Sequence, residues 1–317
     1  MQEVRTHFFL LRRRFFLIFI AGQAWLWAIS QAQDFIYIEQ QFFISSLGNE
    51  GTVHNLIAEA IVKKVVEKFE QRRAAAKNSK NLGPAFRVII LIPQLPEGDF
   101  TRDAGVRAIM FFQSKTIRTM LDEIVARTGV SVPGELILFA SLRAKGDVCE
   151  KMQTNQCYIH SKMLIVDDTI AIIGSANVND RSLCGNRDSE ICVCVRHTPL
   201  KSDIRSLSPI AHLRMQLWNR YCGVPIDDIS SQNAPKFADE FVRMCMNNTA
   251  IYEHASCFCM PSNNITNMRQ YARLTLEADA ARDESPDLAR AQLSDIVGLL
   301  VMFPVKFLNE DTTLTPR

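Results

Sequence analysis

The sequence predicts an α/β fold in which a mixed β-sheet is flanked by helices and is followed by a mainly helical C-terminal region. Between residues 35 and 140, short runs rich in β-branched and aromatic residues alternate with longer segments of helical periodicity. Three short apolar runs then follow closely between residues 158 and 196. After Pro199 the periodicity is mostly helical and is interrupted by prolines. A chain of 317 residues can bury a large core.

The first elements alternate between strand and helix. Residues 35–44 form an apolar run typical of a strand, and residues 53–72 carry apolar side chains three and four positions apart, which predicts an amphipathic helix. A polar linker over 74–84 leads to a strand at 86–92. A long helix is predicted for residues 103–127.

The next elements are mainly strands. A strand is predicted at 135–140, and the charged and polar stretch 143–156 is predicted to be a loop. Residues 158–166 form the next predicted strand, which ends at a turn carrying two aspartates. A short strand at 169–173 follows, and Glu190 opens a third one.

His160 and Lys162 are the residues that point most directly to chemistry. In a strand they lie at i and i+2, so both side chains face the same side. Histidine can act as nucleophile or proton donor near neutral pH, and lysine supplies a point charge that suits a phosphoryl oxygen. Glu190 is predicted to accept the proton of the far ring nitrogen of His160 and so fix its tautomer. Asp167 is predicted to hold the turn rather than to transfer a proton.

A phosphate-binding turn is predicted directly after the second of these strands. Gly174 and Ser175 interrupt it where a backbone can approach a ligand closely. Asn177 is predicted to cap a helix, whose free amides and positive dipole end would hold an anion. A single histidine in an apolar strand is more often structural, but the ordered set of His, Lys, Asp, Gly-Ser and Asn is far more specific. The set therefore predicts a phosphate site.

This set resembles the HKD signature of the phospholipase D superfamily, and neighbouring segments resemble its eukaryotic branch that hydrolyses phosphatidylcholine. The resemblance covers about residues 24–316 and matches the C-terminal half of such an enzyme. It implies one half of an α-β-α sandwich, with Glu39 and Gln41 supporting the phosphate site. The matching segments are 36–44, 92–96, 213–218, 248–253 and 298–304.

The resemblance also implies a division of labour between two histidines. In the family, two HKD motifs meet across a pseudo-twofold axis; one histidine forms a phosphohistidine, and the other protonates the leaving alcohol and then activates water. His160 matches the second motif and would be the general acid and base. No other histidine in the sequence is followed by Lys and Asp at the HKD spacing, so the nucleophile is expected in a different half. No cofactor and no metal are implied.

Three functions remain open on the sequence. The first is the C-terminal half of a phospholipase D that converts phosphatidylcholine into phosphatidic acid and choline, with little activity when isolated. The second is a homodimeric single-HKD phosphodiesterase or nuclease, and the third is a non-catalytic lipid-binding half. The 36 basic and 34 acidic residues give no strong positive field, so nucleic acid is not expected as a partner. The expected partners are phospholipid, a membrane surface contacted peripherally on its cytoplasmic side, and the missing N-terminal half or a second copy.

The chain is expected to divide into three parts. Residues 1–23 match nothing in the family; a basic triplet before an apolar run resembles a signal segment, and the competing interpretation is a gene-model artefact. A true signal over 1–24 would direct the chain to the secretory pathway. Residues 24–198 are expected to form the catalytic half with the single HKD motif, and 199–317 a helical region of the same catalytic unit. Gln40 departs from the family, which usually has Asn there.

Overall fold

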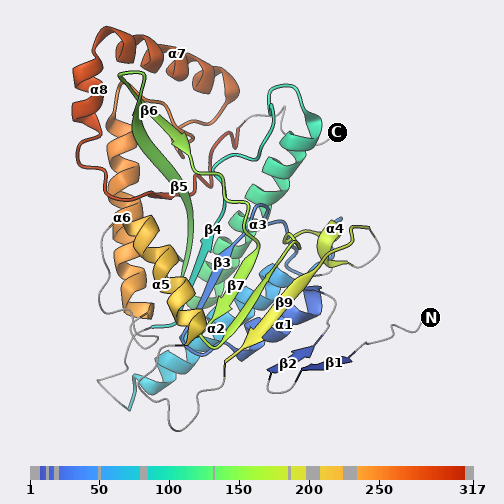
Figure 1. The fold of residues 1–317 in the computed structure, drawn as a ribbon. Coiled ribbons are helices and arrows are strands. Elements are labelled where there is room, and N and C mark those ends of the chain that lie inside the picture. Colours follow the sequence, from blue (N-terminus) through green and yellow to red (C-terminus); the bar gives the residue numbers. More distant parts are fainter. Residues whose placement is uncertain are drawn as a thin grey trace.

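The computed structural model describes residues 8–11, 14–17, 21–48, 51–78, 85–130, 133–184, 187–197, 208–223 and 234–310. Its main feature is a mixed eight-stranded sheet flanked by helices (Figure 1), which confirms the predicted fold class. The strand order is β10-β5-β4-β3-β7-β8-β9, with β6 paired to β5. The bounds are β3 (Phe35–Glu39), β4 (Arg87–Leu91), β5 (Ile137–Val148), β6 (Lys151–Gln156), β7 (Met163–Val166), β8 (Ile170–Gly174), β9 (Cys192–Arg196) and β10 (Leu300–Met302).

Helices cover both faces of the sheet, which explains why its central strands are apolar throughout. β3, β4 and β5 pair in parallel, and alternate residues of β3 face opposite layers. Ile36 and Ile38 share a core cluster with α1, α2 and α3, whereas Tyr37 shares one with α5 and α6. Figure 1 shows these two sets of helices on opposite faces of the sheet. The helices are α1 (Ala21–Gln31), α2 (Ile57–Ala75), α3 (Ala104–Thr128), α4 (Asp180–Leu183), α5 (Pro209–Cys222), α6 (Ala234–His254), α7 (Met268–Glu284) and α8 (Pro286–Gln292).

The two long helices predicted from periodicity, α2 and α3, both form close to their predicted positions. The start of α3 is set by Asp103, whose carboxylate accepts hydrogen bonds from the amides of Gly105 and Val106. Its end is set by Gly129, which has a φ of 73°. The two ends of α3 are therefore set by capping residues that can be recognised in the sequence.

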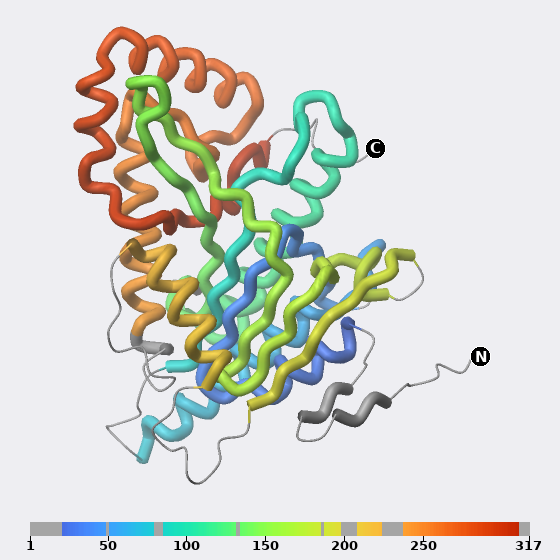
Figure 2. The backbone as a smooth tube through the Cα atoms, in the orientation of Figure 1, coloured from blue at the N-terminus to red at the C-terminus, as the bar shows by residue number. Residues whose placement is uncertain are grey.

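The predicted loop 143–156 is wrong, because this stretch is a β-hairpin. β5 continues to Val148, turns at Cys149 and Glu150 with φ values of 49° and 63°, and returns as β6. Figure 2 shows the hairpin rising from the sheet towards α7 and α8. There Lys151 pairs with Asp283 at 2.8 Å and Arg290 with Asp147 at 3.1 Å. Because many of its side chains meet solvent or charged groups of α7 and α8, the hairpin lacks the apolar pattern of a strand.

Two predicted strands are shorter than expected for a shared reason. β3 ends at Glu39 and β7 begins at Met163, and these two residues are paired with each other. Residues 40–42 and 158–162 lie beyond this last pair, so the pairing of β3 with β7 stops before both segments. His160 and Lys162 therefore precede β7 and do not lie within it.

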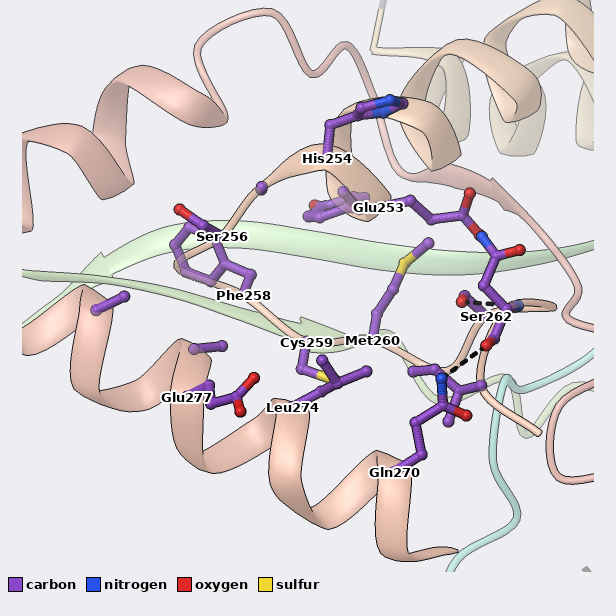
Figure 3. A pocket seen from close by; sticks show the side chains of 16 residues that line it. Glu253, His254, Ser256, Phe258, Cys259, Met260, Ser262, Gln270, Leu274 and Glu277 are labelled. Atoms are coloured by element: carbon purple, nitrogen blue, oxygen red, sulfur yellow. Dashed lines mark hydrogen bonds between the residues drawn. The ribbon is translucent and has the colours of Figure 1, made fainter. Parts of the chain in front are cut away.

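The C-terminal region contributes to the main sheet as well as forming helices. β10 pairs with β5 at the sheet edge, so the region 199–317 shares this sheet with 24–198. The end of α6, the segment after it and α7 enclose a cavity of about 500 Å³ (Figure 3). Its walls are mostly apolar, with Met260 and Leu274 among them, and His254 and Glu277 also line it. The division of the chain into these two regions stays a prediction.

Most of the N-terminal segment 1–23 lies outside the described residues. Within it, β1 (Phe8–Leu11) and β2 (Arg14–Leu17) pair antiparallel, and α1 starts at Ala21. The signal-like interpretation of this segment stays a prediction. In the part of the chain that the structure describes, no helix combines the length and apolarity needed to span a membrane.

Candidate active site

His160 and Lys162 lie where β3 ends and β7 begins. The His160 side chain is exposed, whereas Lys162 is only 8% exposed. The Lys162 ammonium donates to Oε1 of Gln41 at 2.9 Å and to the backbone carbonyl of His160 at 2.7 Å. Burial lowers the pKa of Lys162, and the negative charge of Glu190 opposes that shift. An exposed imidazole and a buried, held ammonium therefore lie two residues apart on irregular backbone, and their joint role stays a prediction.

Glu190 lies near Lys162 but does not bind His160 as predicted. Its carboxylate accepts hydrogen bonds from the hydroxyls of Ser175 and Ser182, the latter at 2.5 Å. Among the described residues, no hydrogen bond joins Glu190 to His160. Gly174 of β8 pairs with Cys192 of β9, so Ser175 lies opposite Ile191, and its amide donates to the Ile191 carbonyl at 2.9 Å. Glu190 precedes Ile191, and the pairing of β8 with β9 therefore brings its carboxylate to the Ser175 hydroxyl.

Gly174 is required by the close packing of β8 against β9. A Cβ atom at this position would lie 2.6 Å from the Cα of Cys192 and would also overlap the carbonyl of Ile191. The absence of a side chain at Gly174 therefore allows β9 to approach β8 closely. The assignment of Gly174 to the phosphate-binding turn stays a prediction.

We expect Gly174→Ala to lower the free energy of unfolding by about 1–3 kcal/mol, because backbone atoms on β9 cannot yield to the added methyl group. Urea denaturation of the purified chain measures this. Gly146→Ala is the matched control, since nothing lies within 4 Å of a Cβ at Gly146. Equal stabilities for the two variants would show that β8 and β9 separate easily.

Asn177 is not the helix cap. The cap of α4 is Asn179, whose side chain accepts from the amide of Ser182 at 3.0 Å. Asn177 lies two residues earlier, and its Oδ1 is buried without a hydrogen-bond partner among the described residues. α4 has only four residues, so the predicted anion site at a helix start has little support. Asn177 therefore contributes a buried amide oxygen without a partner, two residues after Ser175 in the sequence, and not a helix cap.

Asp167 holds the chain where β3 begins, which agrees with its predicted role at the turn. Its carboxylate accepts from the amides of Gln33, Asp34 and Phe35 at 2.7, 2.9 and 2.8 Å. Burial raises the pKa of Asp167, and these three hydrogen bonds act in the opposite direction. All three donors belong to the β3 side of the β3–β7 pair, so this carboxylate is engaged in structure.

Glu39, Gln40 and Gln41 each tie the end of β3 to a different segment. The buried Glu39 carboxylate accepts from Tyr37 at 2.6 Å, from Tyr221 at 3.1 Å and from the Ser161 hydroxyl. The Oε1 atom of Gln40 accepts from the amide of Val178 at 3.2 Å. Only Gln41 contacts an HKD residue directly, through Lys162. Glu39 contacts the motif only through Ser161, which lies between His160 and Lys162.

Sequence reasoning missed two parts of this neighbourhood. Tyr158 stacks on His160, with ring centroids 6.4 Å apart and planes 29° apart, and its hydroxyl contacts Gln41. Asp168, next to the turn aspartate, forms a buried ion pair with Arg214 of α5 at 2.7 Å. Tyr158 lies next to the motif and was visible as its first residue, but nothing in the sequence joined Asp168 to Arg214.

The arrangement combines groups suited to an anionic, proton-requiring reaction. An exposed imidazole can donate or accept a proton, and a buried ammonium beside it can stabilise negative charge. Hydroxyls and a carboxylate lie on the adjoining strand ends at Ser175 and Glu190. In the described residues no group of three or more His, Cys, Asp and Glu side chains could hold a metal ion.

Comparisons with known proteins agree on one family. The family model described as phospholipase D matches residues 20–142 and 127–266. Phospholipase D zeta 1 from Arabidopsis thaliana is 33% identical over 323 residues, covering 89% of this chain and 28% of that protein. Phospholipase D2 from Bos taurus is 34% identical over 307 residues, covering 92% of this chain and 31% of that protein. This chain thus spans less than a third of the length of these relatives.

A similar solved structure is the phospholipase D family member Nuc from Salmonella typhimurium. It shares 17% identity, and the match covers 56% of this chain and 77% of that one. The TM-score of 0.28 is too low for a comparison of the two folds.

Proposed function

Because this chain belongs to the phospholipase D family, we propose that it provides the half of a phosphodiesterase site that carries the acid–base histidine. The proposed substrate is phosphatidylcholine, and the products are phosphatidic acid and choline. One observation carries the proposal: the exposed His160 lies beside a buried Lys162 whose ammonium is held by Gln41 and by the His160 carbonyl. A phosphate bound here would contact the His160 imidazole as proton donor and the Lys162 ammonium as positive charge.

The proposed reaction has two proton transfers at His160. In the first step a histidine of the other half attacks phosphorus, the bond to the choline oxygen breaks, and His160 gives that oxygen its proton. In the second step water attacks phosphorus, His160 takes the proton from that water, and the phosphohistidine bond breaks. Lys162 stabilises the charge on a non-bridging oxygen throughout. We propose Ser175, whose hydroxyl is held by Glu190, as a further donor on the β8 side.

The edge of the main sheet at β9 has features of a surface that binds a partner. β9 ends the strand order of the main sheet, and exposed apolar side chains lie on it and beside it. Ile173, Ile191 and Val193 are 42%, 78% and 47% exposed, and they neighbour Ser175 and Glu190 in the sequence. Large apolar side chains gathered at one place indicate an interaction surface. We propose that the other HKD half covers it. A second copy of this chain is the alternative occupant, and it would make the protein a homodimeric phosphodiesterase or nuclease.

A phospholipid substrate also sets where the protein works. The phosphodiester of phosphatidylcholine lies in the headgroup layer, so the assembled enzyme must meet a membrane surface. We propose peripheral association on the cytoplasmic side. A non-catalytic lipid-binding half would make the same contact without turnover.

We expect the isolated chain to bind phosphate-containing headgroups and to turn over phosphatidylcholine poorly. General acid–base help of about 10²–10⁴-fold has no nucleophilic step to act on when the other half is missing. The measurement is choline release from phosphatidylcholine vesicles, together with transfer to a primary alcohol, by purified chain whose mass in solution is known. The same assay is repeated after a half that carries the first HKD motif has been added.

The three candidate functions give different results in this assay. Activity that appears only with the added half supports the proposed function. Strong turnover by a dimer of this chain supports the homodimeric phosphodiesterase, and strong turnover by a monomer contradicts the half-site. Binding without turnover even with the added half supports the lipid-binding role.

A further inference from the structure

We propose that Tyr158 is a positioning residue that couples His160 to Lys162, so that the orientation of the imidazole and the place of the ammonium are set by one side chain. The kinetic part of this inference rests on the proposed function. Its structural part concerns the isolated chain alone. Three contacts of Tyr158 carry it: one through the ring and two through the hydroxyl.

The ring contact restricts His160. The imidazole is exposed, and among the described residues neither of its ring nitrogens has a hydrogen bond that would fix its rotamer. The Tyr158 ring stacks on it with a centroid separation of 6.4 Å and planes 29° apart. Aromatic pairs in this separation range attract one another in offset geometry. Tyr158 is therefore the side chain that limits how the His160 ring turns.

The hydroxyl acts on Lys162 through Gln41. It accepts a hydrogen bond from Nε2 of Gln41 at 3.2 Å, while Oε1 of Gln41 accepts from the Lys162 ammonium at 2.9 Å. A glutamine amide has one accepting and one donating end. An acceptor at Tyr158 keeps the donating end turned away from Lys162, because a flipped amide would aim its NH₂ group at the ammonium. Removing the hydroxyl thus removes one of the two contacts that hold the Gln41 amide in this orientation, and leaves only the ammonium itself.

The second hydroxyl contact joins this pair to the loop after β4. The amide of Glu97 donates to the Tyr158 hydroxyl at 3.2 Å. Tyr158, Leu95 and Phe100 line a cavity of about 460 Å³ beside this contact. The loop is also held by two hydrogen bonds between Gln156 and the backbone of Leu95, at 3.1 and 3.2 Å. Loss of the phenol oxygen is therefore not expected to release the loop, which separates positioning from a general structural role.

The kinetic test uses Tyr158→Phe, Tyr158→Leu and Gln41→Leu in the enzyme that contains both halves. Tyr158→Phe is expected to lower kcat about tenfold with KM unchanged, a fold-change typical of one lost hydrogen bond. Tyr158→Leu is expected to lose about a further tenfold because the stack is gone as well. The double variant Tyr158→Phe with Gln41→Leu should be no slower than Gln41→Leu alone, since both act through the same ammonium. Tyr271→Phe, which removes a phenol oxygen on α7, is the matched control and should match wild type.

Two readouts need no turnover and are taken on the isolated chain. Binding of inorganic phosphate, followed by NMR, should weaken about tenfold in Tyr158→Phe and stay unchanged in Tyr271→Phe. The ring-proton signals of His160 should keep their wild-type shifts in Tyr158→Phe and move in Tyr158→Leu, because only the latter removes the ring current.

The outcomes separate this inference from the proposed function. Wild-type phosphate binding in Tyr158→Phe, wild-type His160 signals in Tyr158→Leu, or additive losses in the double variant would each overturn the coupling. A two-half enzyme that leaves phosphatidylcholine intact would count against the proposed function, and the ring-proton signals would still decide the case for Tyr158. If Tyr158→Leu does not fold, Tyr158→Phe and Gln41→Leu still test the part of the proposal that concerns the Tyr158 hydroxyl.

Discussion

His160→Ala is expected to lower turnover of phosphatidylcholine by about 10²–10⁴-fold in an enzyme that contains both HKD halves, because the leaving alcohol then has no proton donor. The side chain is exposed, so its removal leaves the fold intact. The measurement is kcat for choline release at saturating substrate. His254→Ala is the matched control, since His254 is an exposed histidine at the end of α6 and should be replaceable without effect.

Lys162→Arg extends this prediction to the positive charge. The planar guanidinium presents its donors differently from an ammonium, and Gln41 and the His160 carbonyl hold the ammonium from two directions at 2.9 and 2.7 Å. We therefore expect activity well below wild type although the charge is kept. Near wild-type rates in either His160→Ala or Lys162→Arg would refute the assignment of the site.

Arg214→Met is expected to lower the free energy of unfolding by about 3–5 kcal/mol, because it strands a buried carboxylate. Arg214 is 0% exposed, and two of its nitrogens bind the two oxygens of Asp168 at 2.7 Å each. Its guanidinium also lies 4.5 Å from the centroid of the Trp218 ring. Removal of the arginine leaves Asp168 charged and only 2% exposed.

The measurement is chemical denaturation of the purified chain, with Arg243→Met as control. Arg243 and Glu240 form an exposed pair on α6, so this control should change stability by less than about 0.5 kcal/mol. The double variant Arg214→Met with Asp168→Leu should recover part of the loss, because the unpaired charge is gone. A loss below about 1 kcal/mol for Arg214→Met alone would mean that water reaches Asp168.

The sequence by itself determined the family and the order of the main elements. The spacing of His160, Lys162, Asp167 and Ser175 pointed to a phosphate site, and an apolar run and period-3.6 patterns located β4, α2 and α3. These features are local: spacing along a strand, capping at a helix end and apolar periodicity depend on residues a few positions apart. Such information is present before the chain folds.

Only the tertiary structure decided which side chains meet. The pairing of β3 with β7 ends at Glu39 and Met163, which leaves His160 on irregular backbone, and the pairing of β8 with β9 gives Glu190 to Ser175. The β5–β6 hairpin could not be predicted because many of its side chains contact solvent or charged groups of helices far away in the sequence.

The same reason applies to the ion pair and to Tyr158. Asp168 and Arg214 are 46 residues apart, and Tyr158 and Gln41 are 117 residues apart. The type of a residue limits which groups its side chain can bind. Which group it does bind depends on the register of the strands and on the packing of α5. Burial is also decided by the tertiary structure. Lys162 was expected as a charge on a strand, whereas in the fold it is a buried ammonium with two acceptors.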